Sequence, residues 1–572
     1  MLYKNAEIFV KKNYMILLLI VITASLPFLL SVLFYGHDLW AHLLRIISVA
    51  EELRNGQFPV RMETKLNNGY GYPWSIYYCD IFLYPVAILY NLGVPLRACY
   101  QLYVIFVNAI TTIFTYLALG KIARNESIRL LGTGLYVLCV YRLVNLNIRA
   151  AAGEYTAMAF LPLVVVGLYL IYVKDTPVRK DWMYLAFGMS GVIMSHILTG
   201  EIIVINIAIL GFVLFKRTLT KKVLFAFLKA AGLTVGITAW FLVPFVDYYL
   251  NQVTLVQKSD LRLLSKSTVD FVFLFQLFAP GKQNGHYITI GLPLILGIGI
   301  ILWVLMEYGE NRGGGCKEKC ILKIWSGFAF LNILFVSKLF PWGKIQNYLG
   351  LDSTGYQIGT IQFAWRFLGP ASVLLVFAIV IALNFMYRNK VENFRIVFFG
   401  LIGAIVLAVG FFNYKYTDEA KTFNLNAVQT YSQTDTLYLL DKTNQSVQGI
   451  AFPKMLSGNA YLSQFERKDG DYKICVENKK EETVMVSMPI YNYRYFNVYD
   501  KNGVLLHKEA MDNNCFSVYI PGFYQGEVIV KFEPPYWWRL AELVSVIFIV
   551  FIIWEMIFYS EREAKFFLKR RP

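Results

Sequence analysis

Long apolar segments separated by short polar breaks run through most of this chain. A transmembrane helix needs about 20 largely apolar residues, and about a dozen segments approach that length. Their approximate positions are 13–35, 98–120, 128–143, 156–173, 183–198, 200–215, 223–246, 288–307, 324–340, 366–387, 395–413 and 537–559. The pattern predicts an α-helical polytopic membrane protein with about 12 transmembrane helices.

The periodicity changes between residues 414 and 535. Short stretches such as DYKICVEN, ETVMVSMPIYN and GEVIVKF alternate apolar and polar positions, and turn signals such as KDGD and DKNG separate them. We expect a β-sandwich here, between a membrane domain at 1–413 and a final helix with a basic tail at 536–572. Cys475 and Cys515 lie in this β-domain. They would either pair or, as we favour, remain unpaired core residues.

Composition and charge support this division. The 572 residues are 57% hydrophobic, above the roughly 45–50% of soluble domains, and the net charge is +16. Basic residues gather in alternate breaks, at 4–12, 121–129, 174–180, 216–222, 312–323, 388–395 and 562–571. Short basic loops on one side follow the positive-inside rule, so we expect both termini to be cytoplasmic and the β-domain to be extracytoplasmic. The charge therefore reports topology, and we expect no nucleic-acid partner.

One more apolar segment, IFLYPVAILYNLGVPL at 81–96, bears on this orientation. If it crossed the membrane, every later basic loop would move to the opposite side. We therefore interpret it as an amphipathic or re-entrant helix within an outer loop at 36–97.

The first candidate chemistry follows the first apolar segment, in YGHDLWAHLLRI. If a helix begins here, Asp38, His42 and Arg45 share one face, and Asp38 could accept a proton from a hydroxyl nucleophile. Alternatively, Asp38 caps the helix while His42 and Arg45 reach the lipid headgroups. His37, Asp38 and His42 also carry metal-ligating atoms, but the spacing of the two histidines does not place them on one face, so a metal site is the weaker hypothesis.

Three further motifs place polar residues at the same outer depth. In IRAAAGEY, Arg149 and Glu154 would either pair with each other or complete a site facing Asp38, and the small residues 150–153 allow close packing. His196 lies in SHILTGE between two apolar runs. The motif IQFAWRFL contributes Gln362, Trp365 and Arg366. Ionisable groups at membrane depth are costly and tend to line polar cavities, so we expect a charged cleft near the outer surface.

Taken together, these motifs resemble a known group of bacterial membrane proteins. The chain resembles the family labelled 6-pyruvoyl-tetrahydropterin synthase-related. It also resembles the YfhO-type proteins, which belong with the GT-C glycosyltransferases. The motifs that carry the resemblance are GHDLWAHLLRI with GYGYPW, IRAAAGE, SHILTG, IQFAWRFL and the outer VSMPIYNYRYFNVYDKNG. The resemblance extends over essentially the whole chain. It implies a GT-C-like catalytic membrane domain at 1–413 in a bacterial cell membrane.

The resemblance also implies roles for individual residues. Asp38 stands where GT-C enzymes carry an acidic residue next to the first span, so it would act as general base. Arg149 and Arg366 would stabilise a departing lipid phosphate, and Glu154 or His196 would position the acceptor or sugar hydroxyls. Glu154 thus counts with Asp38 as a catalytic candidate. The substrate-binding candidates are His37, His42, Arg45, Arg149, His196, Gln362, Trp365 and Arg366.

The leading hypothesis is a glycosyltransferase that uses a polyprenyl-phosphate-linked sugar, such as an undecaprenyl-phosphate hexose or acetylhexosamine. The acceptor would be a cell-envelope glycan such as teichoic acid or a surface polysaccharide. No cofactor is certain; a paired DxD motif is absent around Asp38, which leaves dependence on a divalent metal open. The alternatives are a flippase or transporter of lipid-linked saccharides, which should show internal repeats, and a non-catalytic envelope-assembly factor.

Overall fold

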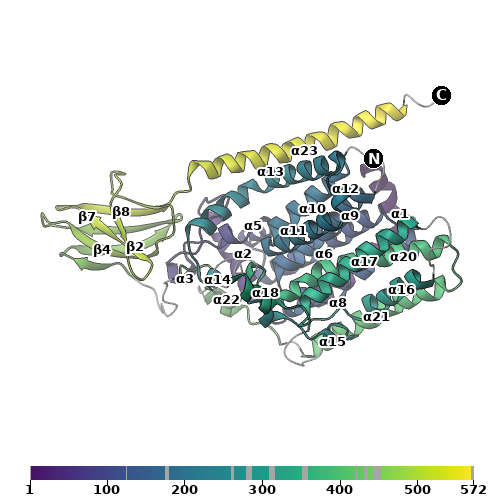
Figure 1. Ribbon diagram of the computed structural model, residues 1–572. Coiled ribbons are helices and arrows are strands. Elements are labelled where there is room, and N and C mark those ends of the chain that lie inside the picture. Colours follow the sequence, from purple (N-terminus) through teal and green to yellow (C-terminus); the bar gives the residue numbers. More distant parts are fainter. Residues whose placement is uncertain are drawn as a thin grey trace.

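The protein consists of a long helical bundle with a two-sheet β-domain at one end (Figure 1). The computed structural model describes residues 2–123, 125–173, 180–258, 263–278, 287–307, 316–350, 359–419, 421–430, 434, 436–441 and 452–568. Parts of the basic loops predicted at 121–129, 174–180 and 312–323, and the last residues of the tail, lie outside this range. Both chain ends lie at the end of the bundle away from the β-domain (Figure 1).

The bundle is built from long apolar helices. They are α1 (Leu2–Ser25), α6 (Leu96–Leu119), α7 (Glu126–Val137), α8 (Val140–Leu143), α9 (Ala152–Val173), α10 (Trp182–Ser195), α11 (Ile197–Val213), α13 (Lys221–Asn251), α16 (Leu292–Glu307), α17 (Cys316–Val336), α20 (Leu368–Arg388), α21 (Phe394–Glu419) and α23 (Tyr536–Leu568). Among the described residues, seven helices are long and apolar enough to cross a membrane, and the bent pair α7 and α8 raises the count to eight. Shorter apolar helices occupy 13–29, 182–195, 197–213 and 292–307. The prediction of a multi-pass helical membrane protein is confirmed.

The break between α7 and α8 is stabilised by a buried arginine. The two halves of this span meet at a bend of 43°. A helix end leaves carbonyl groups without partners, and Arg142 Nη1 donates to one of them, the carbonyl of Val137, at 3.2 Å. Its Nη2 donates to the Thr111 hydroxyl at 2.9 Å. Arg142 thus satisfies the interrupted backbone and anchors α8 to α6.

Short helices fill the segment between α1 and α6. They are α2 (Leu39–Arg54), α3 (Leu66–Gly69), α4 (Trp74–Tyr77) and α5 (Tyr84–Asn91). With eight residues, α5 is about 12 Å long, far short of the roughly 30 Å hydrocarbon layer. It packs against α2, on the side of the bundle that faces the β-domain (Figure 1). The segment 81–96 therefore does not span a membrane.

Other short helices connect these elements. They are α12 (Phe215–Thr218), α14 (Leu255–Lys258), α15 (Phe271–Leu274), α18 (Trp342–Tyr348), α22 (Asn426–Thr430), η1 (Leu26–Leu29), η2 (Val144–Ile148), η4 (Leu264–Ser267), η7 (Gly359–Ile361) and η8 (Ala364–Phe367).

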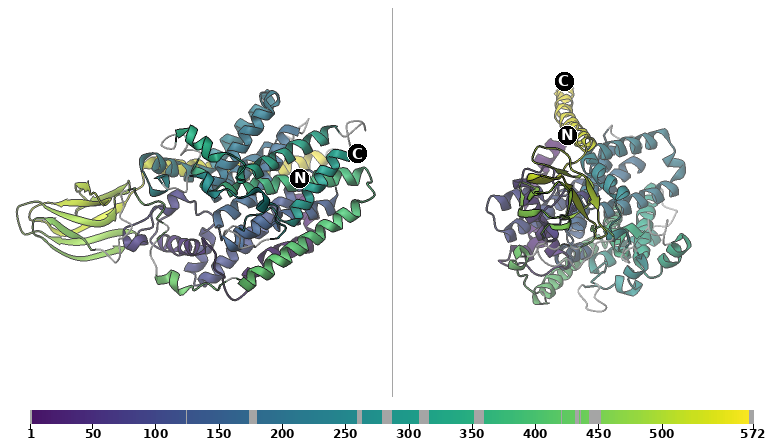
Figure 2. Two further views of the ribbon diagram at one scale, coloured as in Figure 1. Left: turned by 60° about the horizontal axis from the view of Figure 1, so that its bottom comes forward. Right: turned by 90° about the vertical axis from the view of Figure 1, so that its left-hand side faces the viewer.

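The predicted β-sandwich before the last helix is also present. One sheet has the order β1-β4-β7-β6 and the other β2-β3-β8-β5. The strands are β1 (Lys454–Ser457), β2 (Tyr461–Lys468), β3 (Asp471–Glu477), β4 (Val484–Tyr491), β5 (Phe496–Tyr499), β6 (Lys508–Ala510), β7 (Cys515–Ile520) and β8 (Gln525–Phe532). All paired strands are antiparallel, and the domain projects beyond the bundle (Figure 2). The first strand begins at Lys454, later than the predicted domain start at 414. The intervening sequence contains the end of α21 at Glu419 and the short helix α22. Cys475 and Cys515 are unpaired.

One of the links between the β-domain and the bundle is a carboxylate. Asp247, near the end of α13, accepts hydrogen bonds from the Tyr495 hydroxyl and, at 3.0 Å, from Trp538 Nε1. It also forms an ion pair with Arg494 at 3.2 Å. Asp247 thereby connects α13 to the start of β5 and to α23, which runs along α13 on the outside of the bundle (Figure 1).

Candidate active site

A cavity of about 400 Å³ lies where the bundle meets the short outer helices. Figure 1 places α2, α14 and α22 between the bundle and the β-domain, at this end of the molecule. The polar residues that line the cavity are His37, Asp38, His42, Glu154, His196, Gln257, Thr360, Gln362 and Arg366. Its aromatic lining comprises Trp40, Trp74, Tyr77, Tyr78, Phe245, Tyr249, Phe363 and Tyr438. Sequence segments more than 300 residues apart therefore meet at one site.

Backbone contacts fix Asp38 at the wall of this cavity. The Asp38 amide donates to the carbonyl of Arg149 at 2.8 Å, and the His37 amide donates to the carbonyl of Ile148 at 3.1 Å. Gly36 permits this approach, because a Cβ at residue 36 would lie 2.6 Å from the Cβ of Ala150. Although Asp38 occupies the N-cap position of α2, its side chain makes no capping hydrogen bond. The alternative that Asp38 serves as a helix cap is therefore wrong.

The Asp38 carboxylate faces the cavity and accepts no hydrogen bond from any residue that the structure describes. Burial of its surroundings raises the pKa of Asp38, while the charges of Arg149 and Arg366 act in the opposite direction. Burial also lowers the pKa of the neighbouring His37, opposed by Asp38. A carboxylate that is unpaired, accessible and more basic than usual is suited to accept a proton from a ligand.

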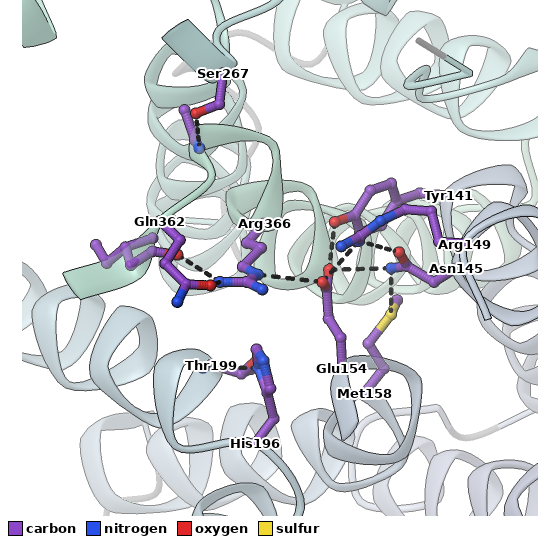
Figure 3. A network of polar contacts seen from close by, with 12 residues as sticks. Tyr141, Asn145, Arg149, Glu154, Met158, His196, Thr199, Ser267, Gln362 and Arg366 are labelled. Atoms are coloured by element: carbon purple, nitrogen blue, oxygen red, sulfur yellow. Dashed lines mark hydrogen bonds and ion pairs between the residues drawn. The ribbon is translucent and has the colours of Figure 1, made fainter. Parts of the chain in front are cut away.

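Glu154, at the start of α9, is the centre of a buried polar network (Figure 3). Its Oε2 accepts from Arg149 Nη1 at 2.7 Å and from Arg366 Nε at 3.4 Å. Its Oε1 accepts from the Tyr141 hydroxyl and from Asn145 Nδ2, the latter at 3.1 Å. Both oxygens are thus engaged by protein donors. The geometry favours a positioning role for Glu154, holding two arginines together, over the catalytic role we expected.

Arg366 presents part of its guanidinium to the cavity. Its Nη1 donates to the carbonyl of Ile361 at 2.6 Å and to Gln362 Oε1 at 3.1 Å. Gln362 adopts a left-handed backbone, with φ of 65°, at this turn. These contacts and the Glu154 ion pair use Nε and Nη1, and Nη2 donates to no residue that the structure describes. A fixed guanidinium with a free N–H edge in a cavity is a suitable ligand for a phosphate oxygen.

Arg149 and Trp365 stand behind this cavity wall. Neither is among its lining residues. The Arg149 guanidinium donates to Asn145 and lies 5.7 Å from the centre of the Trp365 ring, which is stacked on Phe363 at 4.4 Å. We predicted that Arg149 and Trp365 contact the substrate directly, and their position behind the wall does not support that prediction. Arg149 contributes positive charge, and Trp365 supports the ring of Phe363.

His42 and Arg45 also differ from expectation. Arg45 is buried away from the cavity, where it pairs with Asp80 and donates to the carbonyls of Tyr78 and Cys79. The His42 ring lines the cavity, but its Nε2 accepts the amide of Ala152 at 3.2 Å. Burial, with the charge of Arg45, holds the pKa of His42 well below its usual value. We therefore assign both residues to positioning.

The three weak metal candidates were His37, Asp38 and His42, and the Nε2 of His42 is engaged by the amide of Ala152. Within the described part of the chain, no group of three or more His, Cys, Asp and Glu side chains has the arrangement to hold a metal ion.

His196 caps a helix with one ring nitrogen. Its Nδ1 accepts the Thr199 amide at 3.2 Å at the start of α11. We infer from this contact that the proton of a neutral ring resides on Nε2. His196 lines the cavity near Arg366 (Figure 3), so it can donate to a ligand there.

Tyr78 is a site residue that the sequence motifs did not reveal. Its ring lies under the Arg45 guanidinium, 3.9 Å away, and between the rings of His42 and His196, at 5.9 and 6.1 Å. A Cβ at Gly153 would lie 1.9 Å from the Tyr78 hydroxyl. Gly153 of IRAAAGE thus leaves room for Tyr78, and the many aromatic residues of GYGYPWSIYY were the available signal in the sequence.

Comparisons with known proteins leave the family open. No protein-family model matches the chain. A protein of Lactococcus lactis subsp. cremoris, described as uncharacterized, is 20% identical over 620 residues, covering 99% of this chain and 98% of the relative. The similarity extends along both proteins but carries no assigned activity.

Three solved structures share part of the arrangement. Arabinofuranosyltransferase AftD from Mycobacteria has a TM-score of 0.42 and 12% identity over 70% of this chain. The Archaeoglobus fulgidus oligosaccharyltransferase in its apo form has a TM-score of 0.41 and 12% identity over 76%. The same organism's AglB, with an inhibitory peptide and a dolichol-phosphate, has 0.41 and 14% over 73%. The matches span 26% of AftD and 57% of each oligosaccharyltransferase chain. Such TM-scores do not establish a common fold.

Proposed function

We propose that this protein is a membrane glycosyltransferase that moves a sugar from a polyprenyl-phosphate carrier to an extracytoplasmic envelope glycan. The observation that carries the proposal is that one cavity is lined both by the Asp38 carboxylate, which has no hydrogen-bond partner among the described residues, and by the guanidinium of Arg366. A group transfer from a lipid phosphate needs both a proton acceptor and a stabiliser of the leaving phosphate. The resemblance of the motifs to GT-C glycosyltransferases agrees with this division of roles.

The proposed step uses the cavity residues as follows. A hydroxyl of the acceptor attacks the anomeric carbon of the donor and gives its proton to Asp38. The bond between that carbon and the phosphate oxygen breaks through an oxocarbenium-like state. The polyprenyl phosphate leaves with the bonding electrons, and its negative charge is stabilised by Arg366, with Arg149 behind it. His196 Nε2 and Gln362 are placed to orient hydroxyl groups.

The placement of charge supports an outer location for this reaction. The β-domain, and the helices α2 and α14 that contribute lining residues to the cavity, lie at the opposite end of the bundle from both termini (Figure 1). Basic termini and loops are retained in the cytoplasm by the positive-inside rule. We therefore propose that the site opens to the extracytoplasmic side of a bacterial cell membrane.

The test compares two matched substitutions in purified full-length protein. Asp38→Asn removes the base, whereas Asp512→Asn changes an exposed carboxylate in a turn of the β-domain. The substrates are radiolabelled undecaprenyl-phosphate hexose and undecaprenyl-phosphate acetylhexosamine, presented with a crude envelope glycan fraction. We expect Asp38→Asn to lose about 10²–10⁴-fold in transfer and Asp512→Asn to match the wild type.

Two further measurements, of metal dependence and of lipid translocation, distinguish this mechanism from the alternative functions. Because arginines supply the positive charge at the site, we expect activity to survive chelation by EDTA. Equal turnover by Asp38→Asn would contradict the assignment of the base. Translocation of either lipid across a vesicle membrane, without cleavage of the sugar, would identify a transporter instead.

A further inference from the structure

Part of the cavity is an aromatic wall, which we define as Tyr77, Phe245, Tyr249 and Tyr438. The rings of Tyr77 and Tyr438 are stacked in parallel, 4.6 Å apart with an interplanar angle of 3°. Phe245 meets Tyr77 edge-on at 6.2 Å and is stacked on Tyr249 at 5.7 Å. These flat faces border the same space as the Asp38 carboxylate.

Tyr438 reaches this wall from the segment 436–441, which we call the strap. The strap runs beside α14, because the carbonyls of Leu437 and Leu439 accept the amides of Val256 and Leu255, each at 2.8 Å. Leu437 also lines the cavity. The strap is therefore a fixed part of the cavity wall.

Hydrogen bonds to the backbone amide and to the backbone carbonyl of Tyr438 fix its position. Its amide donates to the Tyr72 hydroxyl at 2.9 Å, and its carbonyl accepts from the Tyr493 hydroxyl at 3.0 Å. Tyr72 belongs to the outer loop between α3 and α4, and Tyr493 lies between β4 and β5 of the β-domain. The β-domain thus helps to position one cavity residue without lining the cavity itself.

The wall carries an unsatisfied polar group. Tyr77 is only 4% exposed, and its hydroxyl makes no hydrogen bond with any residue that the structure describes. Buried hydroxyls in proteins nearly always have a partner, and one without a partner costs about 1–3 kcal/mol. Because the oxygen itself is also buried, a ligand in the cavity reaches it only when neighbouring side chains move, and one with its own hydrogen-bonding groups then supplies the missing partner.

We propose that the aromatic wall is the subsite for a sugar ring of the reaction, and that the β-domain completes this subsite through Tyr438. A pyranose has an apolar face of C–H groups that packs on aromatic rings, and hydroxyls at its rim that pair with polar side chains. A polyprenyl tail lacks such hydroxyls and gives no partner to Tyr77. The inference rests on the proposed glycosyl transfer, in which the sugar rings of donor and acceptor must come within reach of Asp38.

The test measures binding of two probe classes to the full-length protein in nanodiscs. Saturation-transfer NMR reports binding of methyl glucoside, methyl galactoside and methyl N-acetylglucosaminide, and a separate titration reports binding of undecaprenyl phosphate. Tyr438→Ala removes the stacked ring, Tyr438→Phe keeps it, and Tyr461→Ala removes an exposed β-domain tyrosine as control. Tyr77→Phe removes only the unpartnered hydroxyl.

We expect at least one glycoside to bind the wild type and to bind Tyr438→Ala about two- to tenfold more weakly. Tyr438→Phe and Tyr461→Ala should bind it normally, Tyr77→Phe should bind it more weakly, and undecaprenyl phosphate should bind all of them equally. If Tyr438→Ala does not fold, Tyr77→Phe decides the question.

Two results would overturn this assignment of the wall. One is the absence of glycoside binding to the wild type. The other is weaker binding of undecaprenyl phosphate, with unchanged glycoside binding, in Tyr438→Ala or Tyr77→Phe. Glycoside binding that behaves as expected, in a wild type that binds no undecaprenyl phosphate, would support the wall and reject the proposed donor.

Discussion

At the scale of single residues, Asp38 and Arg366 differ from the other charges near the cavity. The ionisable side chains of Arg149, Glu154 and Arg45 are bound to protein partners. Asp38 accepts nothing from the described residues, and Arg366 keeps Nη2 available. Asp38 is exposed to the cavity, so its carboxylate is open to a ligand, and charged groups at membrane depth that line a cavity are typical of functional sites.

The ionisation of Asp38 gives a testable pH dependence. The base must be ionised, so kcat/KM should fall as the pH falls through the raised pKa of Asp38, above the ordinary value of about 4. Because the charge of Arg366 lowers that pKa, Arg366→Gln should move the acid limb to higher pH. Arg366→Lys keeps the charge and should leave the limb near its wild-type position. An acid limb that Arg366→Gln does not move would count against Asp38 as the titrating group.

Substitution of Glu154 tests its positioning role. Glu154→Gln removes the counterion of two arginines at a side chain that is 3% exposed. Breaking a buried ion pair costs about 3–5 kcal/mol, so we expect a lower Tm and weaker undecaprenyl phosphate binding. Glu318→Gln, which breaks a half-exposed pair with Arg388, is the control and should change neither quantity. Normal stability with lost turnover would instead make Glu154 a catalytic group.

The chemistry of single residues was only partly accessible from sequence. The motifs predicted a common site for Asp38, Glu154, His196 and Arg366, because the predicted membrane topology places these residues at the same depth. Depth does not say which side of a helix a residue occupies. Arg45 therefore faces Asp80, and Trp365 does not line the cavity, although their motifs also contain residues that do.

At the scale of elements, tyrosines attach the β-domain to the bundle. The alternation of aromatic and polar residues in YNYRYFNVY is typical of a strand with one solvent-exposed face. Instead, Tyr491 packs on Tyr70 at 5.0 Å, Tyr493 holds the strap and Tyr495 binds Asp247. Strand alternation identified the sheets but could not identify the face that meets another domain.

Removal of Asp247 should loosen this attachment. Asp247→Ala deletes the contacts to Arg494, Tyr495 and Trp538, and we expect faster amide exchange in 491–498 while the interior of the sandwich stays protected. Asp270→Ala breaks a largely exposed pair with Lys338 and serves as control. Unchanged exchange in 491–498 would show that other contacts secure the joint.

At the scale of the whole molecule, the sequence pattern was most informative. Apolar length located the helices, because every backbone group in a bilayer must be satisfied internally and few other structures span it. The limit was the polar interval at 414–453, where composition alone did not separate the end of α21 and the strap from the β-domain. The strap is short, and its role depends on tertiary contacts.

Thiol labelling tests the proposed orientation. In a Cys475→Ser background, Asn502→Cys introduces a thiol in an exposed turn of the β-domain. A membrane-impermeant maleimide should label it in intact cells, but should label the exposed Cys320 only after permeabilisation, as read by peptide mass spectrometry. The reverse pattern would invert the topology and place the cavity in the cytoplasm.

The most direct test of the central claim is mass spectrometry of lipids that copurify with the wild type and with Asp38→Asn. If Asp38 is the base and Arg366 binds the lipid phosphate, the donor should accumulate on the variant that cannot use it. We predict a polyprenyl-phosphate-linked sugar enriched on Asp38→Asn and lost from Asp38→Asn combined with Arg366→Gln. Absence of any polyprenyl-phosphate-linked sugar from both the wild type and Asp38→Asn would contradict the account.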